Sequence, residues 1–182
     1  MLVLASASPR RKELIALISK DVKIYPSNCD ESLPPDISVE DAPEFLAIKK
    51  ASSVAKKFPL DIVIGSDTSV IIDNTILGKP KDRADAKRML NLLSGKTHKV
   101  ITGCAIFKDG KSISFSETTL VKFHSLAEEE IENYLDTNEY KDKAGAYGIQ
   151  GYASLLIEKI DGDYFNVVGL PVSRLNQILK RF

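Results

Sequence analysis

The stretch Ile62-Val-Ile-Gly-Ser-Asp-Thr-Ser-Val-Ile-Ile72 decides the fold, because β-branched apolar residues stand on both sides of a short polar segment that carries one acid, Asp67. The apolar runs are too continuous for a half-solvated strand and predict a strand buried in a sheet, with Asp67 at its end or at a kink. An ionised carboxylate there needs cations or donors around it. A turn, with Asn74 closing a hairpin and Asp67 only capping a bend, is the structural alternative, and this stretch leaves both open.

Length and composition fit one compact domain. The chain has 182 residues, of which 43% are hydrophobic and 27% charged, so it can bury a substantial core. Its 25 Lys and Arg residues balance 25 Asp and Glu residues, which leaves no global positive field to hold a nucleic-acid polymer. We therefore expect a single domain over residues 1–182 that meets small anionic ligands through a local cluster.

The cysteines and the amino terminus bear on the compartment. Cys29 and Cys104 match neither a metal-binding CxxC pattern nor a disulfide framework, which favours a reducing environment. Residues Leu2–Ala5 are strand-like and lack the features of a signal peptide, and no apolar run approaches the ~20 residues that span a bilayer. We expect a cytoplasmic protein without a membrane partner.

A helix start follows the first strand. Ser8 is a good N-cap, and Pro9 occupies the first helical position, where proline is favoured. Arg10 and Arg11 lie in the first turn, although the helix dipole prefers acids there. The misfit is explained if an anion binds between them, since helix starts and arginine forks both bind phosphate. Two solvated arginines on a capped helix are the alternative.

An acidic loop and several lysines complete the charged candidates. The proline-broken loop 27–36 contains Glu31, which is either solvated surface or a carboxylate ligand for Mg²⁺. In the helix predicted for residues 39–57, Lys50 lies at the margin of the apolar stripe and Lys49 projects away from it, so helical phase favours Lys50, although a margin lysine usually reaches water. Lys79 lies between a glycine and a proline on a stiff loop just past the Asp67 strand.

The stretch Lys143–Gly151 contains three glycines and suits a loop whose backbone approaches another group closely. Within it, Tyr147 offers a stacking surface and Gln150 an amide able to read a base edge. His98 and His124 have no metal-ligand spacing, and we interpret both as structural or surface residues.

The motifs together resemble the Maf family of nucleoside triphosphate pyrophosphatases over essentially the whole chain. The resemblance is carried by Leu4-Ala-Ser-Ala-Ser-Pro-Arg-Arg11, Asp30-Glu31, Ala47-x-x-Lys50-Ala51, Gly65-Ser-Asp-Thr68, Leu77-Gly-Lys-Pro80, Leu93-Ser-Gly-x-x-His98, Lys143-Ala-Gly-Ala-Tyr-Gly-Ile-Gln-Gly151 and Val168-Gly-Leu-Pro171. Within the family, Arg10, Thr68 and Gln150 match the branch that prefers dTTP and UTP.

The resemblance implies an α/β fold related to the inosine-triphosphate pyrophosphatases, with an elongated mixed β-sheet flanked by helices and two lobes around a central cleft. It also implies hydrolysis of dTTP and UTP to the nucleoside monophosphate and pyrophosphate, a divalent metal (Mg²⁺ or Mn²⁺) and a homodimer. The rival hypotheses are a house-cleaning pyrophosphatase for 7-methylguanosine triphosphate or other modified or purine triphosphates, and a non-catalytic nucleotide-binding regulator of septum formation.

The resemblance also assigns roles to residues. Asp67 would orient or deprotonate the attacking water and share the metal with Glu31. The residues expected to bind the phosphates are Ser8, Arg11, Lys50 and Lys79. The residues expected to read the pyrimidine are Arg10, Thr68 and Gln150.

Overall fold

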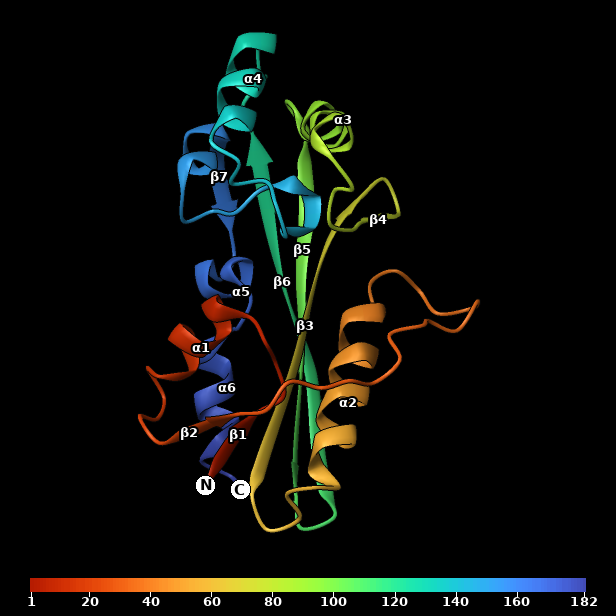
Figure 1. Cartoon of the computed structure of the whole chain (residues 1–182), viewed down its shortest axis with the longest axis vertical. Coiled ribbons are helices and arrows are strands. Elements are labelled where there is room, and N and C mark those ends of the chain that lie inside the picture. The colour runs from red at the N-terminus through yellow and green to blue at the C-terminus, as the bar shows by residue number, and fades with distance from the viewer. The chain divides into compact units, whose positions relative to one another are not determined.

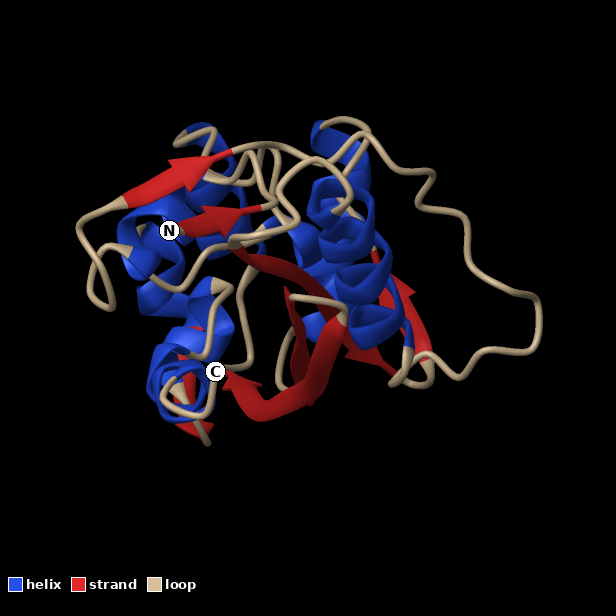
Figure 2. Ribbon diagram, turned by 90° about the horizontal axis from the view of Figure 1, so that it is seen from below, coloured by secondary structure: helices blue, strands red, loops and turns tan.

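A mixed β-sheet of seven strands is the framework of the computed structural model, which describes the whole chain, Met1–Phe182 (Figures 1 and 2). The strands are β1 (Leu2–Leu4), β2 (Val22–Ile24), β3 (Ile62–Ile72), β4 (Thr75–Leu77), β5 (Thr97–Lys108), β6 (Lys111–Phe123) and β7 (Ile157–Asp161). Their order is β2-β1-β3-β5-β6-β7, with β4 paired to β3. Strand β1 runs parallel to β2 and β3, whereas β4 pairs antiparallel to β3.

Helices accompany the strands, which confirms the predicted mixed α/β fold. They are α1 (Pro9–Ile15), α2 (Ala42–Ala55), α3 (Arg83–Leu93), α4 (Glu128–Asp136), α5 (Tyr164–Val168) and α6 (Val172–Leu179), with 3₁₀ turns at Ala144–Ala146 and Tyr152–Leu156. None of these helices is both long enough and apolar enough to cross a bilayer.

The chain forms two compact units, in agreement with the two lobes that the resemblance implies. Unit 1 comprises Met1–Thr68, Ile101–Glu117 and Phe165–Phe182, and unit 2 comprises Ser69–Val100 and Thr118–Tyr164. Three of the four boundaries fall within the long strands β3, β5 and β6, and the fourth follows Tyr164, the first residue of α5.

In unit 1, α2 packs closely on the sheet. Its predicted apolar stripe is confirmed, and the buried cluster consists of Val3, Ala5, Ala47, Ala51, Val54, Val63 and Ala105, from α2 and strands β1, β3 and β5. Two glycines allow the close approach. A Cβ atom at Gly65 would lie 2.3 Å from the Ala47 carbonyl oxygen, and one at Gly103 would lie 2.3 Å from that of Pro43. Helices α1 and α6 lie on the other side of the strands from α2 (Figure 1).

Strand β3 differs from its prediction in one respect. It runs without a break from Ile62 to Ile72, so Asp67 lies in mid-strand and not at an end or a kink. The hairpin alternative was right about the turn, because Asp73 (φ 48°) and Asn74 (φ 58°) adopt the positive φ values of a tight hairpin turn into β4. It was wrong about Asp67, which caps no bend.

In unit 2, the helices α3 and α4 pack against each other, and α3 also contacts the 3₁₀ turn at Ala144–Ala146. Helix α3 begins after Asp82, whose carboxylate accepts a hydrogen bond from the Asp85 N–H at 2.8 Å and so satisfies a free donor of the first turn. Its buried face consists of Ala86, Met89, Leu90 and Leu93. This packing places the glycine-rich segment against a rigid helix.

The contact between α2 and β3 gives a first prediction. Gly65→Ala should lower the free energy of unfolding by at least about 2 kcal/mol, because the added methyl group meets backbone atoms that cannot move aside. Gly78→Ala is the matched control, since a Cβ atom there meets nothing within 4 Å, and it should change stability by less than about 1 kcal/mol. Chemical denaturation followed by circular dichroism measures both, and equal effects would contradict the proposed close packing.

Candidate active site

Asp67 has a lysine partner, as a carboxylate in a buried strand requires. Lys50 Nζ lies 2.6 Å from Asp67 Oδ1 and 3.2 Å from Glu31 Oε1, so one ammonium group joins two carboxylates. The Lys50 and Asp67 side chains are only 12% and 14% exposed, whereas Glu31 is 58% exposed. Solvent screens such a pair weakly, and its charge-assisted hydrogen bond is strong.

The two adjacent lysines separate as helical phase predicts. Lys49 turns to the acidic loop, where its Nζ donates to the Ser32 carbonyl oxygen at 3.2 Å and lies 3.5 Å from Asp30 Oδ2. Lys50 faces Asp67 instead. The choice of Lys50 as the site residue is therefore supported by its contacts.

The acidic loop 27–36 lies in the connection of residues 25–41, which leaves β2 and projects before the chain returns as α2 (orange in Figure 1). The Ser32 backbone N–H and hydroxyl both donate to Asp30, and these hydrogen bonds lower the pKa of the Asp30 carboxyl. Asp30 is thus held within its own loop, and Glu31 is the acid that reaches the Lys50–Asp67 pair.

The start of α1 forms as predicted. Ser8 is the N-cap, its hydroxyl accepts from the Arg11 N–H at 3.4 Å, and Pro9 lies in the first turn with Arg10, which is half-buried. The Arg11 side chain turns inward and donates from Nε to the Gly169 carbonyl oxygen at 2.8 Å. Burial lowers the pKa of Arg11 and the Asp67 carboxylate opposes this, so the guanidinium stays charged.

The glycine-rich segment is anchored in unit 2 by aromatic packing. Tyr147 is 5% exposed, its hydroxyl lies 2.6 Å from His98 Nε2, and its ring packs edge-on against His98 and Phe123. Tyr134 donates from its hydroxyl to the Ala146 carbonyl oxygen at 3.1 Å. The prediction that Tyr147 supplies a stacking surface is therefore wrong, because its ring is buried in the core. Gln150, by contrast, is exposed.

Lys79 lies near this segment within unit 2. The Gly145 N–H donates to the Gly78 carbonyl oxygen at 3.1 Å, which ties the Lys79 loop to the glycine-rich turn. Lys79 itself is 67% exposed and lies 3.8 Å from the exposed Asp142. Of the predicted site residues, Lys79 and Gln150 thus belong to unit 2, and the others belong to unit 1.

Two further features lie outside this cluster. Burial raises the pKa of the Cys104 thiol to about 12, so Cys104 is a core residue and not a nucleophile.

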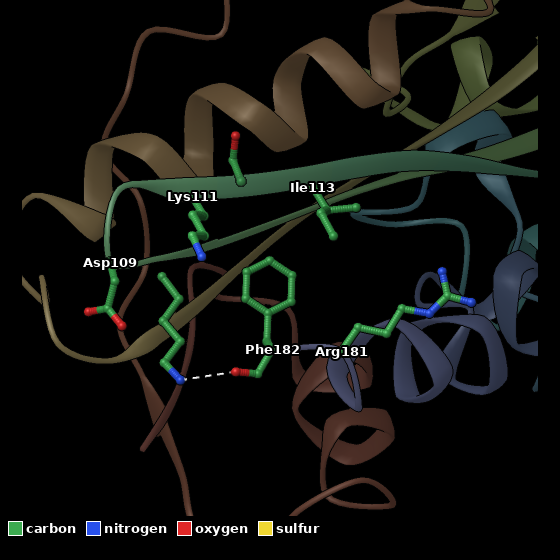
Figure 3. A pocket seen from close by; sticks show the side chains of 7 residues that line it. Asp109, Lys111, Ile113, Arg181 and Phe182 are labelled. Carbon is green, nitrogen blue, oxygen red and sulfur yellow. Dashed lines mark hydrogen bonds between the residues drawn. The ribbon is translucent and has the colours of Figure 1, made fainter.

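A basic pocket of about 480 Å³ lies beside the turn between β5 and β6, where Lys108 Nζ donates to the Phe182 carbonyl oxygen (Figure 3). None of the predicted site residues lines this pocket.

Sequence reasoning missed the buried polar support of Arg11. Thr102 is fully buried in β5 and hydrogen-bonds Thr68 at 2.9 Å, and Ser66 donates to the Gly169 carbonyl oxygen that also binds Arg11. A polar residue in the apolar run of β5 was the available signal for Thr102. Nothing in the sequence pointed to the carbonyl group of Gly169.

The fold defines a structural class. The Staphylococcus aureus Ham1 protein matches with a TM-score of 0.56 at 16% identity over 99% of this chain and 98% of that chain. A HAM1 protein from Coxiella burnetii gives 0.57 at 15% identity over 100% and 98%. The chain therefore has the Ham1 fold.

The family follows from sequence comparison. The family model described as Maf-like protein matches residues 1–182. Proteins named dTTP/UTP pyrophosphatase from Pyrococcus abyssi (49% identity over 99% of this chain and 95% of the relative) and Clostridioides difficile (49% over 100% and 94%) are similar over nearly their full length. The chain belongs to the Maf family.

The anchor of the glycine-rich segment gives a prediction about pH. Burial lowers the pKa of His98 from 6.5 to about 4. In the protonated ring both nitrogens carry hydrogen, and Nδ1 has no hydrogen-bond partner. Between these two pKa values the unfolded chain binds more protons, so the free energy of unfolding should fall by up to about 3 kcal/mol as the pH falls from 7 to 4.

The His98→Gln variant should lose this component of the pH dependence, whereas His124→Gln, at an exposed position, should retain it. Denaturation curves recorded by circular dichroism across this pH range provide the measurement. An unchanged slope in His98→Gln would show that His98 does not titrate in this way.

Proposed function

We propose that the protein hydrolyses dTTP and UTP to the nucleoside monophosphate and pyrophosphate. The observation that carries the proposal is the cluster in which Lys50 joins Asp67 and Glu31, in a chain about 49% identical to proteins named dTTP/UTP pyrophosphatase. Cleavage between the α and β phosphates needs an oriented water, neutralisation of the triphosphate and cations for the leaving pyrophosphate. In unit 1, one lysine ammonium group contacts two carboxylates, which supports the proposal.

The roles follow from the chemistry of each side chain. Asp67 would orient or deprotonate the water that attacks the α phosphorus. The residues proposed to bind phosphates are Ser8, Arg11, Lys50 and Lys79. Their cationic members would offset the charge that develops on pyrophosphate as it leaves. Arg10, Thr68 and Gln150 are the residues proposed to set the preference for pyrimidines.

We further propose a divalent cation, Mg²⁺ or Mn²⁺, held by Asp67 and Glu31. No group of three or more His, Cys, Asp and Glu side chains gathers as a metal cluster. Mg²⁺ is, however, typically bound by one or two carboxylates together with substrate phosphates. The Lys50 ammonium group contacts both carboxylates, so this pair of carboxylates already attracts one cation. A bound metal would supply charge neutralisation at the triphosphate.

The proposal has further parts. We propose that residues 1–182 act as one functional domain, and the family model matches this whole range. We also propose a cytoplasmic homodimer, and the two unpaired cysteines suit a reducing compartment. Sedimentation equilibrium tests the homodimer directly. A role in septum formation would follow from nucleotide turnover and not from binding alone.

A panel of dTTP, UTP, 7-methylguanosine triphosphate and ITP, each with Mg²⁺ and with Mn²⁺, tests the substrate class by release of pyrophosphate. We expect kcat/KM for dTTP and UTP to exceed the purine values by at least about 10-fold, since a site that hydrogen-bonds one base leaves its polar groups unpaired with another. Equal values across the panel would contradict the pyrimidine preference. Binding without turnover would favour the regulator hypothesis.

In the same assay, Asp67→Asn should lower kcat by about 100-fold to 10,000-fold, because the amide cannot accept a proton, while the circular dichroism spectrum stays unchanged. Asp73→Asn, in the exposed turn directly after the same strand, is the matched control and should leave turnover intact. Unfolding of Asp67→Asn would show instead that the carboxylate is structural.

The bridging contact of Lys50 gives a prediction about metal binding that does not depend on turnover. Lys50→Met should bind Mn²⁺ more tightly in the absence of nucleotide, because the ammonium no longer competes for Asp67 and Glu31. Its turnover should fall because a phosphate-binding cation is lost. Titration of free Mn²⁺ by electron paramagnetic resonance measures the affinity, with Lys49→Met as the control at the adjacent position. Equal Mn²⁺ affinity in Lys50→Met and wild type would contradict a shared site.

A further inference from the structure

A chain of hydrogen bonds with assigned protons leads from Arg11 into the core of unit 1. Arg11 Nη2 donates to Thr68 Oγ1 at 2.9 Å, the hydroxyls of Thr68 and Thr102 lie 2.9 Å apart, and Thr102 donates to the Asn166 carbonyl oxygen at 2.9 Å. A hydroxyl has one proton, and a carbonyl oxygen only accepts. The Thr102 proton therefore points to Asn166, so the Thr68 proton must point to Thr102.

This assignment limits what Thr68 can do for a ligand. Its hydroxyl accepts from Arg11 and donates to Thr102, so it has no proton to offer to a base. Thr68 is half-buried, and the methyl group of its side chain carries no hydrogen-bonding information. Direct reading of a pyrimidine by its O–H would require the chain of hydrogen bonds to break.

Arg11 is held at three points by the protein. Besides the bond to Thr68, Nε donates to the Gly169 carbonyl oxygen at 2.8 Å and Nη1 donates to Ser6 Oγ at 3.4 Å. A guanidinium has five N–H donors. One N–H on each terminal nitrogen is left over, and arginine donors on two nitrogens suit the oxygens of a phosphate. A rigidly held guanidinium loses little rotamer entropy when it binds such a ligand.

We infer that Thr68 and Thr102 are positioning residues that fix the guanidinium of Arg11 for a phosphate group of the substrate. The inference rests on the proposed role of Arg11 as a phosphate-binding residue. Thr68 then affects every nucleoside triphosphate alike, and this role replaces its proposed share in the preference for pyrimidines, which Arg10 and Gln150 retain. Substitution of Thr102 is the most informative test of this positioning role, because Thr102 is 0% exposed and cannot touch a ligand itself.

The experiment compares Thr68→Val and Thr102→Val with wild type, using dTTP, UTP, dATP and ITP as substrates and pyrophosphate as an inhibitor. We expect kcat/KM to fall by about 10-fold to 100-fold for every substrate. Thr68→Val loses a hydrogen bond to a charged group, and Thr102→Val removes the acceptor that orients the Thr68 hydroxyl toward this bond. The ratios between substrates should stay constant, and inhibition by pyrophosphate should weaken in parallel. Thr68→Ser and Thr102→Ser keep the hydroxyl and should restore both values toward wild type.

A matched control separates positioning from stability. Thr119 is also 0% exposed, and its hydroxyl bonds the Asp163 backbone at 3.0 Å in unit 2. Thr119→Val should lower the melting temperature without changing the inhibition constant of pyrophosphate. If Thr119→Val weakened pyrophosphate inhibition as much as Thr102→Val does, the effect would be one of general stability and the inference would fail.

The other outcomes are also decisive. A change in the ratio of pyrimidine to purine turnover in Thr68→Val, with none in Thr102→Val, would show that Thr68 reads the base. If wild type turns over none of the triphosphates, the proposed function fails, and calorimetric titration with pyrophosphate then decides the inference. Weaker binding in Thr102→Val and in Arg11→Met would support it, whereas equal binding, or none by wild type, would overturn it.

Discussion

The contact of Lys50 with Asp67 is the interaction on which the site depends. A carboxylate in the middle of a buried strand is costly unless a cation meets it, and the ammonium at 2.6 Å does so. The same ammonium group lies 3.2 Å from Glu31, so it links the exposed loop that carries Glu31 to the strand that carries Asp67. One lysine thereby gathers two acids, which is the arrangement that a divalent cation and a triphosphate can share.

Backbone packing makes this contact possible. Lys50 projects toward Asp67 only because α2 lies close to the sheet, and the glycines at positions 65 and 103 leave the room for the helix backbone. On the other side of the strands, Arg11 is held by the Gly169 carbonyl oxygen and Thr68. Glycine packing and buried hydroxyls therefore set the geometry of the charged groups. On the proposed mechanism, residues that never touch the ligand would therefore affect its binding.

Much of this architecture could be predicted from sequence, where local chemistry determines structure. The Ser8 cap and the apolar stripe of α2 follow from helical geometry and are confirmed. Helical phase also favours Lys50 over Lys49, and Lys50 is the lysine that contacts Asp67, whereas its role in the site stays a prediction. The predictions failed where tertiary packing decides. Asp67 was predicted to interrupt its strand because the sequence alone does not show that the Lys50 ammonium group compensates its charge in mid-strand. Tyr147 looked like a stacking platform because its burial depends on His98 and Phe123, which are distant in sequence.

The central claim is that Asp67 directs a water molecule to the α phosphorus of the nucleotide. A single turnover of dTTP by excess enzyme in ¹⁸O-enriched water, with mass analysis of the products, tests it most directly. The account predicts one ¹⁸O atom in the nucleoside monophosphate and none in pyrophosphate. Label in pyrophosphate would place the attack at the β phosphorus. Unlabelled products would mean that a protein carboxylate attacks the phosphorus and that water then cleaves the acyl phosphate at its carbonyl carbon, which leaves the ¹⁸O in the protein. Either result would contradict the account.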